Sequence, residues 1–226
     1  DLSTNFSKTN LHNIDCMEFM QTVPDNFYDL AIVDPPYGIN ATKMQMGGIK
    51  KRHGLTYNAE STAQKIRKGR LNSGGGKLKN RILNQSDCDW DNESPDEHYF
   101  NELFRISKHQ IIWGGNYFKL PPTRGIIIWD KLQPWENFSQ VELAWTSFDK
   151  PAALYRQSTT GGANAEKKIH ATQKPIELYG YLLNKYAKSG YKILDSHFGS
   201  GSSIIACERL GFDVDACERN KNIFNL

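Results

Sequence analysis

Short apolar runs alternate along the chain with stretches in which apolar residues recur at helical spacing. Buried parallel strands are predicted where near-continuous apolar residues are bounded by Gly, Pro or Asp. They are Asp29–Val33, Gln110–Trp113, Gly125–Trp129, Val141–Trp145, Lys192–Leu194 and Asp213–Ala216, with Leu11–Ile14 as a weaker candidate. Helices are predicted over Pro95–Ser107, Ile176–Ala187 and Ser202–Leu210. This alternation predicts an α/β domain built on a mostly parallel sheet.

Length and composition indicate one globular domain. The chain has 226 residues, of which 38% are hydrophobic and 12% aromatic, and this is enough for one core. No apolar stretch approaches the ~18–20 residues that a membrane helix needs, and the first residues show no signal-peptide pattern. The four cysteines are scattered without a CxxC pair, which favours a reducing cytoplasm and no metal site.

The net charge of +3 conceals a strongly basic segment. Residues 39–86 contain eleven Lys and Arg residues and one acid, so the segment carries +10 and the rest of the chain −7. Because the segment also contains glycine pairs and few large apolar residues, it is predicted to be a loop inserted into the domain. Two interpretations stay open: a solvated basic linker, or an arm that contacts nucleic-acid phosphates.

Asp34-Pro35-Pro36-Tyr37 directly follows the predicted strand Asp29–Val33. Two consecutive prolines fix φ twice, remove two backbone donors and hold the preceding residues extended. The expected result is a stiff turn that projects a carboxylate, free carbonyls and an aromatic ring. A carboxylate beside a free carbonyl can accept both protons of an exocyclic amino group, and Tyr37 offers a flat face to a planar ring. The alternative is a rigid surface turn.

A second candidate site, Asp195–Gly201, lies between the predicted strand Lys192–Leu194 and the predicted helix from Ser202. Its Gly-x-Gly turn brings backbone amides close to a ligand at a helix N-terminus. The pattern is neither a dinucleotide fingerprint nor a P-loop. Glu218 follows the next predicted strand, where an acid can hydrogen-bond ribose hydroxyls; taken alone, it is equally well a solvated surface acid.

Together with a third motif, the two sites resemble DNA amino-methyltransferases that use S-adenosylmethionine, in the permuted group whose catalytic motif precedes the cofactor motif. Asp34–Tyr37 matches the family's [D/N/S]PP[Y/F] motif, and Asp195–Gly201 matches its DPFxGSG motif with Ser196 and His197 as departures. His170–Pro175 matches the HPTQKP motif, with Ala171 in place of Pro. Asn13–Cys16 resembles the segment that reaches the cofactor adenine. The resemblance runs from about Leu11 to Asn222, outside the basic segment.

The resemblance implies a Rossmann-like class I methyltransferase fold, with a mostly parallel seven-stranded sheet, helices on both faces and a circularly permuted strand order. The implied cofactor site comprises Asp15, Cys16, Thr172, Lys174, Asp195, His197, Phe198, Gly199, Ser200, Gly201 and Glu218. In it Asp195 is expected near the methionine amino group, Lys174 near the methionine carboxylate and Glu218 at the ribose. Which of the two adjacent rings, His197 or Phe198, packs near the cofactor stays open.

The resemblance also implies the reaction. A target base is flipped out of the duplex, stacks on Tyr37 and donates its amino protons to Asp34 and the Pro35 carbonyl, at a catalytic site formed by Asp34, Pro35, Pro36 and Tyr37. An aspartate at the first motif position favours adenine N6 in this family. Cytosine N4 is the alternative within the enzyme class, and a non-catalytic methyltransferase-like DNA-binding subunit is the alternative outside it.

Few residues are left for the family's usual target-recognition region, since about twenty separate Phe148 from His170. We therefore expect the basic segment to contact double-stranded DNA through Lys50, Lys51, Arg52, Arg67, Lys68 and Arg70, with Arg156–Lys168 as a second contact loop. Trp113–Tyr117 either lines the cleft or forms a tight turn. A cytoplasmic protein of a bacterium or phage is expected; a homodimer and a cognate restriction nuclease stay open as partners.

Overall fold

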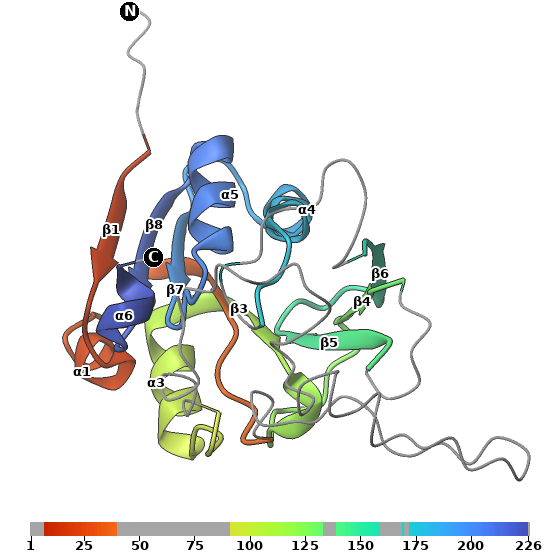
Figure 1. The fold of residues 1–226 in the computed structure, drawn as a ribbon, viewed down its shortest axis with the longest axis horizontal. Helices are drawn as coiled ribbons and strands as arrows, with labels where there is room; N and C mark the ends of the chain where they lie inside the picture. Colours follow the sequence, from red (N-terminus) through yellow and green to blue (C-terminus); the bar gives the residue numbers. More distant parts are fainter. Residues whose placement is uncertain (1–6, 40–90, 133–138, 159–168, 170–171, 226) are drawn as a thin grey trace, which may run out of the picture.

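The computed structural model describes residues 7–39, 91–132, 139–158, 169 and 172–225, and these form one sheet flanked by helices (Figure 1). The strands are β1 (Thr9–His12), β2 (Tyr28–Val33), β3 (Ser107–Trp113), β4 (Ile126–Asp130), β5 (Val141–Thr146), β6 (Ala153–Arg156), β7 (Lys192–Asp195) and β8 (Asp213–Cys217). The helices are α1 (Cys16–Gln21), α3 (Glu97–Ile106), α4 (Ile176–Tyr186), α5 (Ser202–Leu210) and α6 (Lys221–Phe224), with a 3₁₀ turn η4 (Gly115–Tyr117).

The strand order in the sheet is β1-β8-β7-β2-β3-β5-β4-β6. The first strand of the chain therefore lies beside the last one, as the permuted order implies. All neighbours are parallel except β5, which runs antiparallel to both β3 and β4. The predicted α/β class with a mostly parallel sheet is confirmed.

Two details of the predicted sheet are wrong. Val141–Trp145 was expected among the parallel strands, but β5 is antiparallel because ten residues separate it from β4, and a parallel crossover needs a dozen or more. The sheet also has eight strands among the described residues, not seven. The additional strand, β6, lies at the edge beside β4 and alternates between buried and exposed side chains, so it has no continuous apolar run to reveal it.

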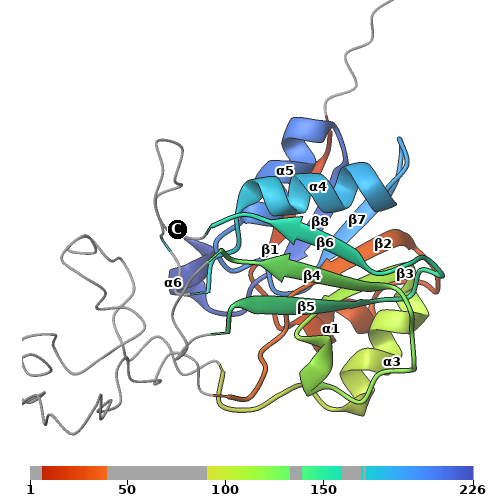
Figure 2. The ribbon, with the colours of Figure 1, turned by 90° about the vertical axis from the view of Figure 1, so that its right-hand side faces the viewer.

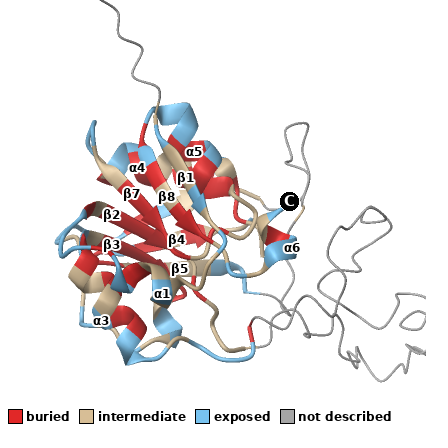
Figure 3. Ribbon diagram, turned by 90° about the vertical axis from the view of Figure 1, so that its left-hand side faces the viewer, coloured by how far each residue is buried: buried red, intermediate tan, exposed pale blue. Residues whose placement is uncertain are grey.

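Helices cover both faces of the sheet, with α4 and α5 on one side and α1 and α3 on the other (Figure 2). Successive side chains of β2 point to opposite faces of the sheet. Leu30 and Ile32 pack in the core beneath α4 and α5, whereas Ala31 and Val33 pack with α1 and α3. A strand buried on both faces must be apolar throughout. Figure 3 shows this burial concentrated in the central strands.

The predicted helices are confirmed to within two residues at each end. Asp96 caps α3 by accepting a hydrogen bond from the backbone N–H of Tyr99. The third helix, α5, has the predicted bounds and is enclosed by Gly201 and Gly211, both in the left-handed backbone region.

The middle of the sheet contains a topological switch point between β2 and β7, which are parallel neighbours. The chain leaves β2 through α3 toward β3, and it leaves β7 through α5 in the opposite direction toward β8. Loops that diverge in this way leave a crevice at the carboxyl ends of the strands, where open α/β sheets bind ligands. The Asp34 turn and the Asp195 loop both begin at this point.

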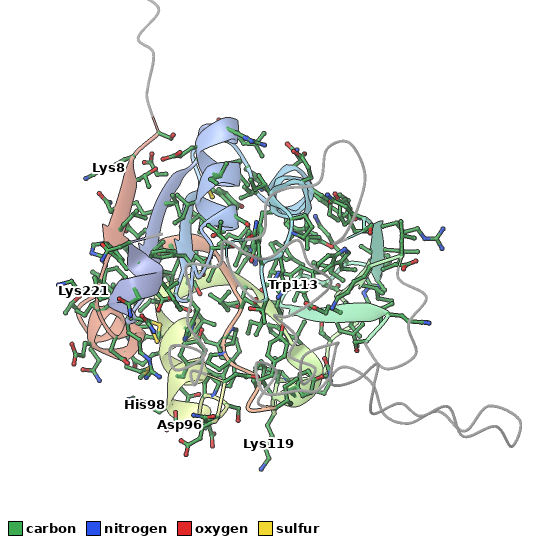
Figure 4. The ribbon with its side chains drawn as sticks, in the orientation of Figure 1. Lys8, Asp96, His98, Trp113, Lys119 and Lys221 are labelled. Carbon is green, nitrogen blue, oxygen red and sulfur yellow. The ribbon has the colours of Figure 1, made fainter. Side chains whose placement is uncertain are left out.

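Trp113 ends the neighbouring strand β3 and is fully buried in the interior, whereas Lys119 extends outward beyond it (Figure 4).

Within the described ranges, no helix combines the length and apolar character needed to cross a membrane. The basic segment lies outside the described residues except for Ile39. The insert boundaries 39–86 and the DNA contacts expected at Lys50, Lys51, Arg52, Arg67, Lys68 and Arg70 therefore stay predictions.

Candidate active site

The turn after β2 is held by hydrogen bonds as well as by its prolines. The Asp34 carboxylate accepts the Tyr37 hydroxyl at Oδ1, at 2.7 Å, and the Lys174 ammonium at Oδ2, at 2.5 Å. Beneath the turn, the backbone N–H groups of Tyr37 and Gly38 both donate to Oδ1 of buried Asp91, at 2.7 and 2.9 Å. The carboxylate and the ring of the motif are therefore fixed relative to one another.

Lys174 lies directly before α4 and has a side chain that is only 3% exposed. Its ammonium is 2.5 Å from Asp34 Oδ2 and 3.2 Å from Oε2 of Glu142, on β5. The other oxygen of Glu142 forms an ion pair with Lys131, which follows β4. Two acids and two lysines thus alternate in one chain of contacts.

These contacts keep the buried groups ionised. Burial alone would lower the pKa of Lys174, but the carboxylates of Asp34 and Glu142 outweigh it and raise that pKa. Burial alone would raise the pKa of Glu142, but the ammonium groups of Lys174 and Lys131 outweigh it and hold that pKa at about 2. The Lys174 ammonium therefore lies with the Asp34 turn, and its expected contact with the methionine carboxylate stays a prediction.

The segment after β3 packs against the Tyr37 ring. Tyr117, in η4, stacks on Tyr37 with ring centroids 4.9 Å apart and planes 15° apart, and Phe118 meets Tyr37 edge-on. Gly114 has φ +70°, and a Cβ there would lie 2.2 Å from Cε1 of Tyr37. Trp113–Tyr117 thus forms a tight turn that packs against Tyr37, and its role in lining a ligand cleft stays a prediction.

Replacing Gly114 with Ala is expected to destabilise the protein by about 1–3 kcal/mol more than Gly211→Ala does. Both glycines have nearly equal positive φ, +70° and +74°, so both variants carry the same kind of backbone strain. Only at Gly114 does the added methyl group overlap a neighbour, the Tyr37 ring, whereas Gly211 has open space. Urea unfolding of both variants measures the difference; equal losses would show that Tyr37 yields freely.

The Asp195 loop contains a buried carboxylate and two glycines in the left-handed region. Asp195 is 2% exposed, and its oxygens accept the backbone N–H of His197 at 3.0 Å and the Ser203 hydroxyl at 2.5 Å. Burial raises the pKa of Asp195 to about 7. Gly199 and Gly201 have φ of +52° and +75°, and α5 begins at the next residue with no side-chain cap. The first turn of α5 therefore has backbone donors that no capping side chain satisfies, the arrangement that binds anions and polar ligands at helix N-termini.

The two adjacent rings of this loop have different surroundings. Phe198 is buried in the core, where its ring packs near that of Phe224. His197 instead has Nδ1 2.9 Å from the Ser196 hydroxyl and Nε2 3.7 Å from Sγ of Cys16. Burial lowers the pKa of His197 to about 4, so the ring is neutral near pH 7. Of the two rings, His197 faces the segment that the resemblance places at the cofactor adenine.

Three acids lie at the carboxyl ends of three adjacent strands. Asp195 ends β7, Glu218 follows β8, and Asp15 lies between β1 and α1. Glu218 accepts the backbone N–H of Asn220 at 2.8 Å, and burial raises its pKa; Asp15 caps α1 through the N–H of Met17. Acceptors spaced along one edge, beside a glycine turn, fit a ligand with an amino group and a ribose diol.

The structure brings the candidate residues together in two adjoining groups. Asp34, Tyr37 and Lys174 form one, and the Asp195 loop with Asp15, Cys16 and Glu218 forms the other. Thr172 is in the turn two residues before Lys174, while His170 and Ala171 lie outside the described residues.

Two functional candidates were missed from the sequence. The sequence pattern could have revealed Glu142, because it stands inside the apolar predicted strand Val141–Trp145 and a buried acid needs a charged partner. Asp91 gave no such signal, because it lies in no recognisable pattern.

A sheet of this order, with acids and a glycine turn at its switch point, defines a Rossmann-like class I methyltransferase fold. Residues 109–226, about half of the chain, match the DNA methylase family N6_N4_Mtase. The protein belongs to this family of DNA methyltransferases, which act on amino groups of DNA bases and use S-adenosylmethionine as the methyl donor.

Solved structures with the same fold confirm the architecture. M1.HpyAVI in complex with S-adenosylmethionine is 17% identical, with 96% of each chain covered and a TM-score of 0.53. The cytosine-N4-specific PvuII DNA methyltransferase is 11% identical, with 95% of this chain and 83% of that one covered and a TM-score of 0.53. TTHA0409 from Thermus thermophilus, complexed with S-adenosyl-L-methionine, is 16% identical, with 96% and 90% covered and a TM-score of 0.50. At these identities the likeness concerns the fold alone.

Proposed function

We propose that the protein transfers a methyl group from S-adenosylmethionine to the N6 amino group of adenine in DNA. The observation that carries this proposal is the Asp34 carboxylate, held beside the Tyr37 ring at the switch point that also contains the Asp195 loop. The choice of adenine rests on aspartate at the first motif position, as the resemblance implies. Cytosine N4 is the alternative, because the same acceptors would take either amino group.

The chemistry proposed for the residues is positioning and hydrogen-bond acceptance. S-adenosylmethionine supplies an electrophilic sulfonium methyl group. Asp34 accepts a hydrogen bond from the amino group, which keeps the nitrogen lone pair out of conjugation with the ring and free to attack. As the methyl carbon bonds to the nitrogen, its bond to the sulfonium sulfur would break and the sulfur would leave as a neutral thioether. The nitrogen must also lose a proton, and Asp34 is the acceptor in contact with it. Pro35 contributes its carbonyl, and Pro36 keeps the turn rigid.

The residues proposed to hold the cofactor follow from the acids and the glycine turn. Asp195 pairs with the amino group in the methionine part of the cofactor, and Glu218 accepts hydrogen bonds from the ribose hydroxyls of the cofactor. Asp15, Cys16 and His197 lie at its adenine edge. Burial raises the pKa of the Cys16 thiol to about 12, so Cys16 contacts the ligand as a neutral group and not as a nucleophile. Charge alone supports DNA contact by the basic segment 39–86.

Cofactor affinity is expected to rise about tenfold between pH 6 and pH 8. In the free protein burial raises the pKa of Asp195 to about 7, so below that pH it carries a proton that must leave before the carboxylate can pair with an ammonium group. Glu218, whose pKa burial also raises, adds a change of the same sign. His197, with its pKa near 4, stays neutral across this range.

Titration calorimetry with S-adenosylmethionine across this pH range measures the dependence. Asp195→Asn is expected to bind weakly with little dependence on pH, and the matched control Asp213→Asn, on the exposed side of β8, is expected to keep the parent profile. A flat profile in the parent would contradict the role given to Asp195.

The experiment that tests the function is methylation of unmethylated genomic DNA, followed by nucleoside digestion and mass spectrometry. N6-methyladenine is the expected product. N4-methylcytosine would overturn the choice of base while keeping the mechanism. An absence of any methylated base, with cofactor binding intact, would favour the non-catalytic DNA-binding alternative.

A further inference from the structure

The Lys174 ammonium competes for the carboxylate on which the proposed reaction depends. It donates to Asp34 Oδ2 at 2.5 Å, while the Tyr37 hydroxyl occupies Oδ1. A carboxylate has lone pairs for further donors, but a buried ammonium at this distance offsets most of its negative charge. An amino group that approaches Asp34 therefore meets a weaker acceptor for as long as Lys174 remains in full contact.

A second carboxylate lies on the other side of the same ammonium. Glu142 Oε2 is 3.2 Å from Lys174 Nζ, against 2.5 Å for Asp34. Glu142 comes from β5 and Asp34 from the turn after β2, so two separate parts of the sheet hold one lysine between them. The lysine is 3% exposed, so water cannot readily replace either carboxylate as its partner.

We propose that Glu142 is a positioning residue for methyl transfer: it takes the Lys174 ammonium when Asp34 accepts the amino group of the target base. A displacement of the flexible lysine head toward Glu142 by about 0.7 Å, the difference between the two distances, would give Glu142 the shorter contact and Asp34 the longer one. Lys174 then keeps a charged partner throughout, and the negative charge of Asp34 is offset less, so that Asp34 is a stronger acceptor for the amino group. Lys131 completes the arrangement by pairing with Oε1 of Glu142 and holding this carboxylate in place.

This inference rests on the proposed role of Asp34 and does not depend on which base is methylated. The assay therefore measures transfer of radiolabelled methyl groups from saturating S-adenosylmethionine to unmethylated genomic DNA under single-turnover conditions. The products are identified separately by mass spectrometry. N4-methylcytosine would thus overturn the adenine assignment without affecting the test of Glu142.

Glu142→Gln is expected to lower the single-turnover rate at least tenfold and to leave the dissociation constants for the cofactor and for DNA within twofold of the parent values. Glu142→Asp, which keeps the charge on a shorter side chain, is expected to retain more activity than Glu142→Gln. A purely structural role predicts the opposite order, since Gln preserves the shape of Glu and Asp does not. Glu177→Gln, which removes a surface carboxylate paired with Arg209, is the matched control.

A double-mutant cycle provides the decisive comparison. If Glu142 acts through Lys174, Glu142→Gln has at most a twofold effect on the rate when Lys174→Met is already present. An unchanged tenfold effect in that background would overturn the inference, as would parent-like rates for Glu142→Gln alone. Circular dichroism spectra of each variant establish that it is folded, and the order of the Asp and Gln variants decides the matter if the double variant does not fold.

Discussion

Asp34→Asn is expected to lower the rate of methyl transfer about 10²–10³-fold, the usual effect of removing one group that stabilises charge in a transition state. The amide keeps the shape of the carboxylate but loses its negative charge, and one of its two ends becomes a donor that repels the amino group of the base. The fold is expected to survive, because Lys174 retains Glu142 as a charged partner. Single-turnover transfer of labelled methyl groups to DNA measures the loss.

The control for this variant is Asp149→Asn, which removes an exposed carboxylate paired with Arg124. It is expected to match the parent in rate. Cofactor affinity measured by calorimetry is expected to change by less than threefold in Asp34→Asn, since Asp34 belongs to the base site. A variant that kept more than a third of the parent rate would show that another group accepts the amino proton.

Patterns confined to one segment of the chain were sufficient to predict most of the fold. In the predicted strand Asp29–Val33, Leu30–Val33 are apolar without interruption because both faces of the strand are covered there, and the structure places the strand at Tyr28–Val33. The edge strand β6 could not be predicted in the same way, because a strand at the sheet edge needs few apolar residues. The direction of β5 depends on the length of its connection to β4, which apolar pattern alone does not encode.

In the candidate site too, motifs within one segment could be predicted from the sequence, whereas contacts between distant segments could not. The turn at Asp34 and the loop at Asp195 could be recognised because each is a short motif directly after a strand. The contact of Lys174 with Asp34 could not be predicted, since it joins residues 140 positions apart through the order of strands in the sheet. A carboxylate such as Asp91, which fixes the turn from outside every motif, can be found only from the folded structure.

Lys174→Met is expected to destabilise the protein by about 3–5 kcal/mol, the typical cost of removing one partner from a buried ion pair. The Met side chain is similar in length, so little packing is lost. Without the ammonium, however, the partly buried carboxylates of Asp34 and Glu142 remain near one another, and Glu142 keeps only Lys131 as a charged partner. Urea unfolding with a linear extrapolation measures the free energy of unfolding.

Lys108→Met is the matched control, because the Lys108 ammonium pairs with Asp29 at 2.8 Å but its side chain is 53% exposed. An exposed pair contributes at most about 1 kcal/mol, so this variant is expected to unfold near the parent midpoint. Adding Glu142→Gln to Lys174→Met is expected to restore part of the lost stability, because it removes the repulsion between the two carboxylates that face one another once the ammonium is gone. If Lys174→Met lowered the free energy of unfolding no more than Lys108→Met does, the chain of charges around Lys174 would not contribute to stability. Packing of the lysine stem, and not its two carboxylate partners, would then keep Lys174 in place.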